Sequence, residues 1–139
     1  WSRTGARVAD VLADQLPVLQ AAPRRPHLVL VAVGSNDVFW GLRTAPARRG
    51  LAELVASLPQ PAVVATVPAQ GPAVRARAVN RSLRDAAGHA GVAVADVART
   101  IRGGRDSLAP DGFHPNDTGY AEWAAAFRPA IAAALGLPR

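Results

Sequence analysis

Three short, largely apolar runs limit the fold of this chain more than any other feature of its sequence. They cover residues 28–33, 62–67 and 92–97, with Gly34 closing the first run and Pro68 the second. A short run that is apolar at nearly every position is typical of a strand covered on both faces, as in a parallel sheet. We therefore expect three buried, parallel strands.

Segments with helical periodicity alternate with these runs. The expected helices are residues 8–19, 47–58, 74–89 and a last one from about 116 to about 135. Asn116 or Asp117 can cap the last helix, which continues despite Pro129, and Pro17 is expected to end or bend the first. The alternation of helix and strand predicts a right-handed parallel α/β sheet with helices on both faces, in a single domain over residues 1–139.

Asp111 and His114 lie in the string D-G-F-H-P-N-D, between the third strand and the last helix. In a tight turn, this spacing lets the carboxylate accept a hydrogen bond from imidazole Nδ1–H, which fixes the tautomer and leaves Nε2 free as a base. Gly112 permits the turn, and Pro115 favours an extended backbone at His114. The two residues form a candidate acid–base pair, although a turn-forming aspartate beside a loop histidine would give the same string.

Asn36 follows the first strand in the string G-S-N-D. A side-chain amide at the carboxyl end of a parallel strand, where ligands bind in such sheets, can donate a hydrogen bond to a developing oxyanion. Gly5 can present a backbone N–H to the same place, because helix starts leave N–H groups unpaired. Taken alone, an ordinary polar turn explains G-S-N-D better. Phe39 and Trp40, slightly further along, either line this site or belong to the core.

Taken together and in this order, the strings S-R-T-G-A, V-G-S-N-D and D-G-F-H-P-N-D-x-G-Y resemble the sequence blocks of the SGNH hydrolases, also called GDSL-type esterases and lipases. The resemblance extends over essentially the whole chain. It implies a flavodoxin-like three-layer α/β/α sandwich and the hydrolysis of small-molecule acyl esters without a metal or organic cofactor. It also implies that His114 and Asp111 belong to a catalytic triad and that Gly5 and Asn36 are oxyanion donors.

The family's first block, a G-D-S segment that carries the nucleophilic serine, has no counterpart in this sequence. The chain begins at Trp1 and contains no methionine, so we expect an N-terminally truncated, partial domain without the first two strands and the serine. Ser2 and Ser35 lie near the candidate site, but neither follows a strand in the family's pattern. The other serines, Ser57, Ser82 and Ser107, are expected away from it. We therefore expect no nucleophile in this chain and essentially no activity from it alone.

The missing strands also affect association. The family's sheet order is 2-1-3-4-5, so this chain would keep only the contiguous strands 3-4-5, and residues 28–33 would form an exposed apolar edge. A long hydrophobic edge pairs readily with another chain. We therefore expect the isolated chain to be marginally stable or to self-associate through this edge.

Composition leaves two further classes of function open. The formal charge of +6 comes from 16 basic residues, all of them arginine, and a nucleic-acid-binding module would use the face of Arg77, Arg81 and Arg84. The arginines are scattered and aromatic residues are scarce, so we expect no nucleic-acid partner. The second alternative is a non-catalytic α/β domain. No apolar run approaches the roughly 18 residues of a membrane span, and no metal-ligand cluster is visible.

Overall fold

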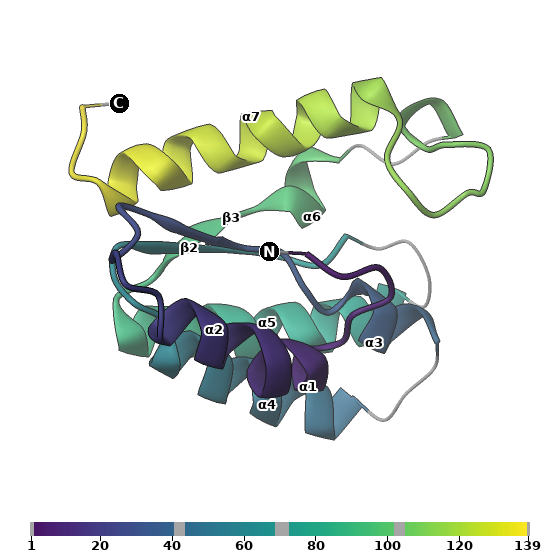
Figure 1. Cartoon of the computed structure of the whole chain (residues 1–139). Helices are drawn as coiled ribbons and strands as arrows, with labels where there is room; N and C mark the ends of the chain where they lie inside the picture. The colour runs from purple at the N-terminus through teal and green to yellow at the C-terminus, as the bar shows by residue number, and fades with distance from the viewer. Residues whose placement is uncertain (1, 41–43, 69–72, 102–104, 139) are drawn as a thin grey trace.

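A computed structural model describes residues 2–40, 44–68, 73–101 and 105–138 of the chain (Figure 1). The elements are α1 (Val8–Asp10), η1 (Val11–Gln15), α2 (Leu16–Gln20), β1 (Val29–Val31), α3 (Ser35–Phe39), α4 (Thr44–Ser57), β2 (Ala62–Ala65), α5 (Ala73–Ala90), β3 (Ala93–Ala95), α6 (Val97–Thr100), η2 (Arg105–Ser107) and α7 (Asp117–Ala134). η1 is a π-helical turn and η2 a 3-10 turn. The three predicted strands and four predicted helices are therefore all present.

The three strands form one parallel sheet in the order β1-β2-β3. Val63 in the central strand pairs in register with Leu30 on one side and Ala93 on the other. All four residues of β2 are buried, which is the environment expected of a strand that is apolar at every position.

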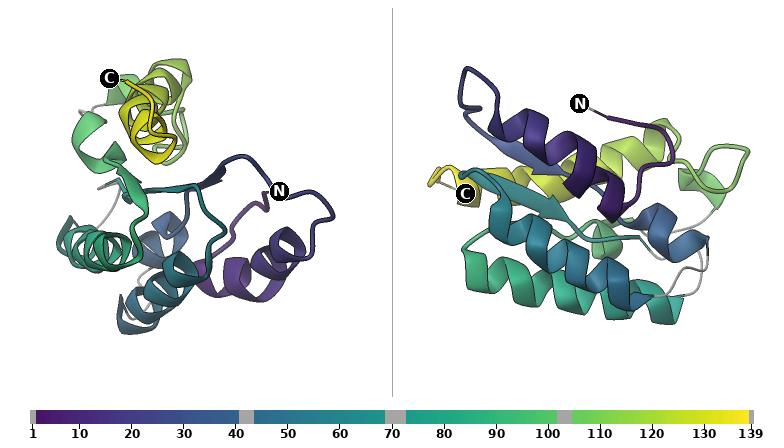
Figure 2. Two further views of the ribbon diagram at one scale, coloured as in Figure 1. Left: turned by 90° about the vertical axis from the view of Figure 1, so that its left-hand side faces the viewer. Right: turned by 60° about the horizontal axis from the view of Figure 1, so that its bottom comes forward.

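Helices cover both faces of this sheet and produce three layers (Figures 1 and 2). The helical stretch from α1 to α2, together with α4 and α5, lies against one face, and α7 lies against the other. One apolar cluster, which includes Leu51, Leu54 and Leu83, fills the first interface, and a second, which includes Val63 and Ala126, fills the interface with α7. The predicted α/β/α architecture is confirmed.

The first helix passes through Pro17, where we had expected it to end or bend. It continues to Gln20, and the π-helical turn Val11–Gln15 directly precedes the segment that contains the proline. Proline lacks the N–H that would donate to residue i−4, and its ring crowds that carbonyl. A wider turn just before the ring accommodates both defects, so the helix continues.

Two short helices occupy stretches that were expected to be loop or strand. Gly34 leads directly into α3 with a φ of +108°, and a Cβ at this position would lie 2.9 Å from a side-chain atom of Val67. Val97 was expected to be the last residue of the third strand, but it begins α6. Periodicity in such short segments does not distinguish a strand end from the first turn of a helix.

Candidate active site

The carboxyl ends of the three strands point to one end of the molecule, on the right in Figure 1. The N-terminal segment before α1, the short helix α3 and the loop between η2 and α7 come together at this end. These three segments carry Gly5, Asn36 and the Asp111–His114 pair, respectively. The topology therefore gathers the residues that the sequence singled out.

Asp111 and His114 are in direct contact. His114 Nδ1 lies 2.6 Å from Asp111 Oδ2, while Asp111 Oδ1 accepts hydrogen bonds from the backbone N–H groups of Phe113 and His114 at 2.9 and 3.0 Å. The hydrogen bond from the His114 side chain, followed by those from the two backbone N–H groups, lowers the pKa of Asp111 to about 2. An ionised carboxylate has no proton to donate, so Nδ1 carries the hydrogen and Nε2 of the neutral ring is the free base.

Short-range hydrogen bonds hold the loop that carries this pair. Ala109 N–H donates to the carbonyl of His114 at 2.8 Å, and Leu108 and Pro115 form an antiparallel bridge. Gly112 N–H donates to the carbonyl of Ala109 at 2.9 Å. The φ of Gly112 is +68°, which explains why glycine is suited to this turn.

Asn116 fastens the loop to the start of α7. Its Oδ1 accepts from Gly119 N–H at 3.0 Å, which makes it the cap of the helix, and its Nδ2 donates to the carbonyls of Asp106 and Leu108 at 2.8 and 3.1 Å. Of the two predicted caps, Asn116 is thus the one observed. A Cβ on Gly119 would overlap the carbonyl oxygen of Ser107, so the loop backbone packs directly on the helix.

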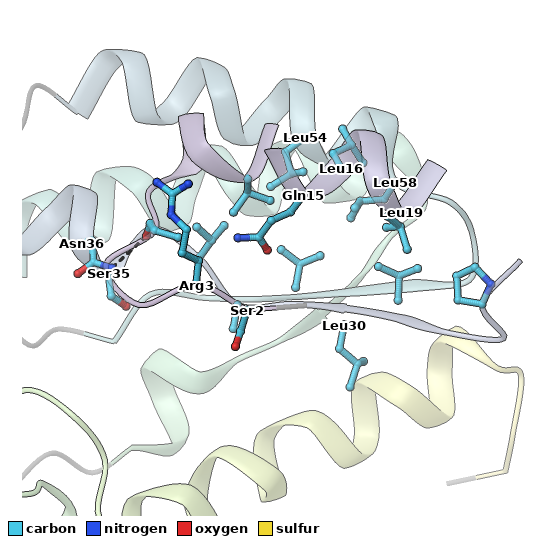
Figure 3. A pocket seen from close by; sticks show the side chains of 18 of the residues that line it. Ser2, Arg3, Gln15, Leu16, Leu19, Leu30, Ser35, Asn36, Leu54 and Leu58 are labelled. Atoms are coloured by element: carbon cyan, nitrogen blue, oxygen red, sulfur yellow. Dashed lines mark hydrogen bonds between the residues drawn. The ribbon is translucent and has the colours of Figure 1, made fainter. Parts of the chain in front are cut away.

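Asn36 and the segment around Gly5 are also brought together. Asn36 Nδ2 donates to the carbonyl of Ala6 at 2.9 Å, and Figure 3 shows this bond beside Ser35. An amide nitrogen has two N–H groups, so one of them remains for another acceptor. Gly5 adopts a φ of +75°, and its N–H has no acceptor within the described residues. Both predicted oxyanion donors therefore keep an N–H group available.

Asp37 holds the N-terminal segment in this position, a role that sequence reasoning missed. Its side chain is buried, and its Oδ2 accepts a hydrogen bond from Val8 N–H at 3.1 Å. Burial raises the pKa of Asp37, against the opposing effect of the Val8 N–H. The only signal in the sequence was the position of Asp37 directly after Asn36, and its partner lies 29 residues away.

Aromatic side chains connect the two halves of the candidate site. The rings of Phe39 in α3 and Phe113 in the loop have centroids 4.6 Å apart, and the ring of Phe113 lies 5.1 Å from that of His114. Phe39 and its neighbour Trp40 are exposed. Of the two roles that the sequence left open for these aromatics, core packing is therefore wrong, and a role in lining the site stays a prediction.

No serine is hydrogen-bonded to His114 in the part of the chain that the structure describes, which includes all five serines. Ser57 Oγ donates to the carbonyl of Glu53, Ser82 Oγ accepts from Arg48, and Ser107 is buried. Ser2 and Ser35 line the same pocket as Asn36 (Figure 3).

That pocket runs along the outer edge of β1, has a volume of about 420 Å³ and extends from Asn36 to Pro26. Leu30 is 51% exposed, although Val63, its partner in register, is 0% exposed. The reason is that α7 packs on β2 and β3 and leaves this face of β1 open (Figure 2). Trp123 also lines the pocket, and its Nε1 is buried without an acceptor among the described residues.

Two features concern the described ranges as a whole, namely metal-ligand groups and membrane-spanning helices. These ranges contain no group of three or more histidine, cysteine, aspartate or glutamate side chains arranged to hold a metal ion. None of their helices combines the length and apolarity needed to cross a bilayer.

Comparisons with known proteins bear on the family and the fold of this chain. The sequence profile of the GDSL-like Lipase/Acylhydrolase family matches residues 1–122. No curated protein matches the chain.

Several solved structures share the fold. An α/β hydrolase enzyme from the metagenome of Lake Arreo, Spain, has 24% identity and a TM-score of 0.73 over 93% of this chain and 69% of its own. A carbohydrate esterase of family 3 from Talaromyces cellulolyticus has 23% identity and a TM-score of 0.74 over 96% and 70%. A catalytic mutant of an acetylxylan esterase from Geobacillus stearothermophilus has 20% identity and a TM-score of 0.75 over 91% and 68%.

At these identities the solved structures establish the common fold, and the profile, which covers most of the chain, establishes the family. The chain belongs to the GDSL-like lipase/acylhydrolase family, a family of esterase-type hydrolases.

Proposed function

We propose that this chain supplies the acid–base pair and the oxyanion donors of a serine-type hydrolase of acyl esters. The observation that carries the proposal is the 2.6 Å contact between Asp111 and His114, in which an ionised carboxylate orients the imidazole and leaves Nε2 free. Asn36 and Gly5 add N–H donors at the same end of the sheet. Together these are the groups that stabilise charge and move protons in acyl transfer.

In the proposed reaction, His114 Nε2 takes the proton of a serine hydroxyl as its oxygen bonds to the acyl carbon of the ester. The carbonyl oxygen becomes an oxyanion, which accepts hydrogen bonds from Asn36 Nδ2 and Gly5 N–H. The ester C–O bond then breaks, and the leaving alcohol takes the proton from Nε2. Water repeats the sequence on the acyl-enzyme and releases the carboxylic acid. Throughout, Asp111 orients the ring and stabilises the imidazolium.

The nucleophilic serine in this proposal lies outside the 139 residues, at the end of a strand that pairs with the free edge of β1. A strand parallel to β1 would have its carboxyl end beside Asn36, as β1 itself does. The open face of Leu30, which lines the pocket along β1, offers an apolar contact to such a strand. One similar enzyme supports a serine in this role, because its catalytic mutant replaces a serine with alanine.

In the isolated chain we propose that a second copy covers this edge. An apolar strand with unpaired backbone groups is a template for pairing between chains. A strand that carries the serine would occupy the same edge and displace the copy. Self-association and completion of the site are therefore alternative states of one surface.

The experiment compares two proteins, the 139-residue chain and the longer product of its gene that includes residues encoded before Trp1. The chain alone is expected to release essentially no p-nitrophenol from p-nitrophenyl acetate, whereas the longer protein hydrolyses it. If the isolated chain hydrolyses the ester rapidly and His114→Ala abolishes that activity, the proposal that the nucleophile lies outside this chain is contradicted. A gene without a G-D-S segment upstream of Trp1 would favour the non-catalytic domain instead. The nucleic-acid alternative has less support, since Arg84 of the arginine face is paired with Asp96 at 2.8 Å.

A further inference from the structure

Three aromatic residues from two distant segments form a continuous surface next to His114. Phe39 and Phe113 are the pair that links α3 to the loop, and Trp40 meets Phe39 edge to face with ring centroids 5.3 Å apart. Phe113 in turn meets the ring of His114 at an interplanar angle of 83°. We call Phe39, Trp40 and Phe113 the aromatic wall.

The aromatic wall is not part of either apolar cluster that stabilises the fold. Phe39 is 42% exposed and Trp40 is 65% exposed, although α3 buries the preceding Val38 almost completely. Exposed large apolar side chains that lie side by side, rather than scattered singly, mark binding surfaces. The direct contact of this surface with the candidate base identifies what it would bind, namely a part of the substrate.

The chemistry of acyl transfer decides which part. Because Nδ1 of His114 is taken by Asp111, only Nε2 can return a proton to the leaving group. The alcohol part of the ester must therefore leave beside the His114 ring, while the acyl oxygen lies toward Asn36. The aromatic wall borders His114 through Phe113, and we therefore assign it to the alcohol side.

We propose that the aromatic wall binds an alcohol part with a flat apolar face, either an aryl ring or the C–H face of a pyranose ring. This inference rests on the proposed function, because it uses the proton transfer from His114 to the leaving group. Tilted and perpendicular aromatic rings offer both faces and edges for contact with a second ring. A short alkyl alcohol offers no such face, so Phe39 and Trp40 are specificity-determining residues that favour ring alcohols.

Binding of the free alcohol tests the inference without any hydrolysis. The chain has three tryptophans, so its ¹⁵N–¹H spectrum contains few indole N–H signals. The signal that disappears in Trp40→Phe is that of Trp40. Titration with phenol or with methyl β-D-glucopyranoside is expected to shift the Trp40 signal and leave Trp123 in place, and ethanol is expected to shift neither. The compound that shifts the Trp40 signal more, phenol or the glucopyranoside, identifies whether the alcohol part is an aryl or a pyranose ring.

Two variants sharpen this test. Phe39→Leu keeps an apolar contact with Phe113 but removes the flat face, and it is expected to weaken binding about fivefold. Leu137→Ala removes an exposed apolar side chain beyond the far end of α7 and is expected to change nothing. An unshifted Trp40 signal with both ring alcohols, or unchanged affinity in Phe39→Leu, would overturn the inference.

Hydrolysis of ethyl acetate by the longer protein separates the two proposals. If hydrolysis proceeds while ring alcohols fail to bind, the inferred role of the aromatic wall is wrong and the proposed function stands. If ring alcohols bind but no ester is hydrolysed, the proposed function is wrong and the aromatic wall remains a binding surface for ring alcohols.

Discussion

The loop of residues 106–116 and the outer edge of β1 lie at the same site but are built in opposite ways. In the loop, the polar groups of Asp111, His114 and Asn116 find partners within the loop or at the start of the following helix. Along β1, the outer backbone edge has no strand partner among the described residues, and Leu30 is half exposed. The loop is locally complete, whereas the edge of β1 leaves one side of the strand unpaired in the described residues.

Under the proposed function, this difference describes how the active site would divide between segments of the chain. Groups that exchange and orient a proton need fixed geometry over a few ångström, which a short loop can provide by itself. A nucleophile at the end of a central strand needs the sheet around it. In the proposed function, a chain without that strand keeps the acid–base pair formed but has no nucleophile for it to activate. The predictions below test whether the two regions are as independent as their contacts indicate.

The largest expected effect is on catalysis. In the longer protein, His114→Ala is expected to lower kcat on p-nitrophenyl acetate about 10⁴- to 10⁶-fold, because no other group takes the serine proton. His89→Ala is the matched control, since His89 is exposed on α5 and the one side-chain hydrogen bond of its ring among the described residues is to the carbonyl of Asp85. If His114→Ala lowered kcat less than tenfold and left the circular dichroism spectrum unchanged, the loop would have no part in the mechanism.

The second prediction concerns Leu30 on the open edge. Leu30→Lys is expected to lower the unfolding free energy of the longer protein by about 3 kcal/mol, because a strand beside β1 would bury the charge. In the isolated chain the same change is expected to cost little and to shift sedimentation toward the monomer, because the lysine ammonium stays in water.

Val18→Lys provides the control for Leu30→Lys, because Val18 is similarly exposed but lies on α2. It is expected to leave the stability of both proteins and the association of the isolated chain almost unchanged. Equal effects of Leu30→Lys on the longer protein and on the isolated chain would show that no strand covers β1.

The third prediction concerns the side chain of Asn116, which fastens the loop to the start of α7. Asn116→Ala is expected to lower the free energy of local opening by about 2 kcal/mol, because it removes the helix cap and leaves the carbonyls of Asp106 and Leu108 without their donor. Asp117→Ala, at the next position, is expected to cost at most about 0.5 kcal/mol through its interaction with the helix dipole. Amide hydrogen exchange at Gly112 and Gly119 measures both, and equal protection in the two variants would contradict the role of Asn116.

What the sequence predicted follows the same division between local and distant contacts. Apolar runs and helical spacing identified the strands and the long helices, and three-residue spacing identified the Asp111–His114 pair, because each of these patterns is local. The bonds from Asn36 to Ala6 and from Val8 to Asp37 join residues about 30 positions apart, and the aromatic wall joins α3 to a loop near the other end of the chain. No local pattern encodes such pairs, and the π-helical turn before Pro17 was missed because periodicity assumes a regular helix.

The smallest expected effect is a pair of opposite titrations. Asp111 in the loop has its pKa lowered to about 2, mainly by the His114 side chain, whereas burial raises the pKa of Asp37 above 3.8. At pH 3 the Asp111 carboxyl is therefore expected to be ionised while that of Asp37 is protonated, which ¹³C carboxyl shifts distinguish. In His114→Ala the pKa of Asp111 is expected to move back toward 3.8, and that of Asp37 is expected to stay in place.

The signs of the two shifts give opposite effects on stability. The contribution of Asp111 is present above pH 3.8 and is lost as the pH falls through about 2, because the folded state prefers the carboxylate. The contribution of Asp37 is full below pH 3.8 and is lost as the pH rises through its raised pKa, because the folded state prefers the neutral acid. If both carboxyls titrated together at 3.8, neither the closed loop nor the buried anchor of the N-terminal segment would exist in solution. Separate titrations would show that the hydrogen bond from His114 to Asp111 and the burial of Asp37 both exist in the chain before any external strand is added.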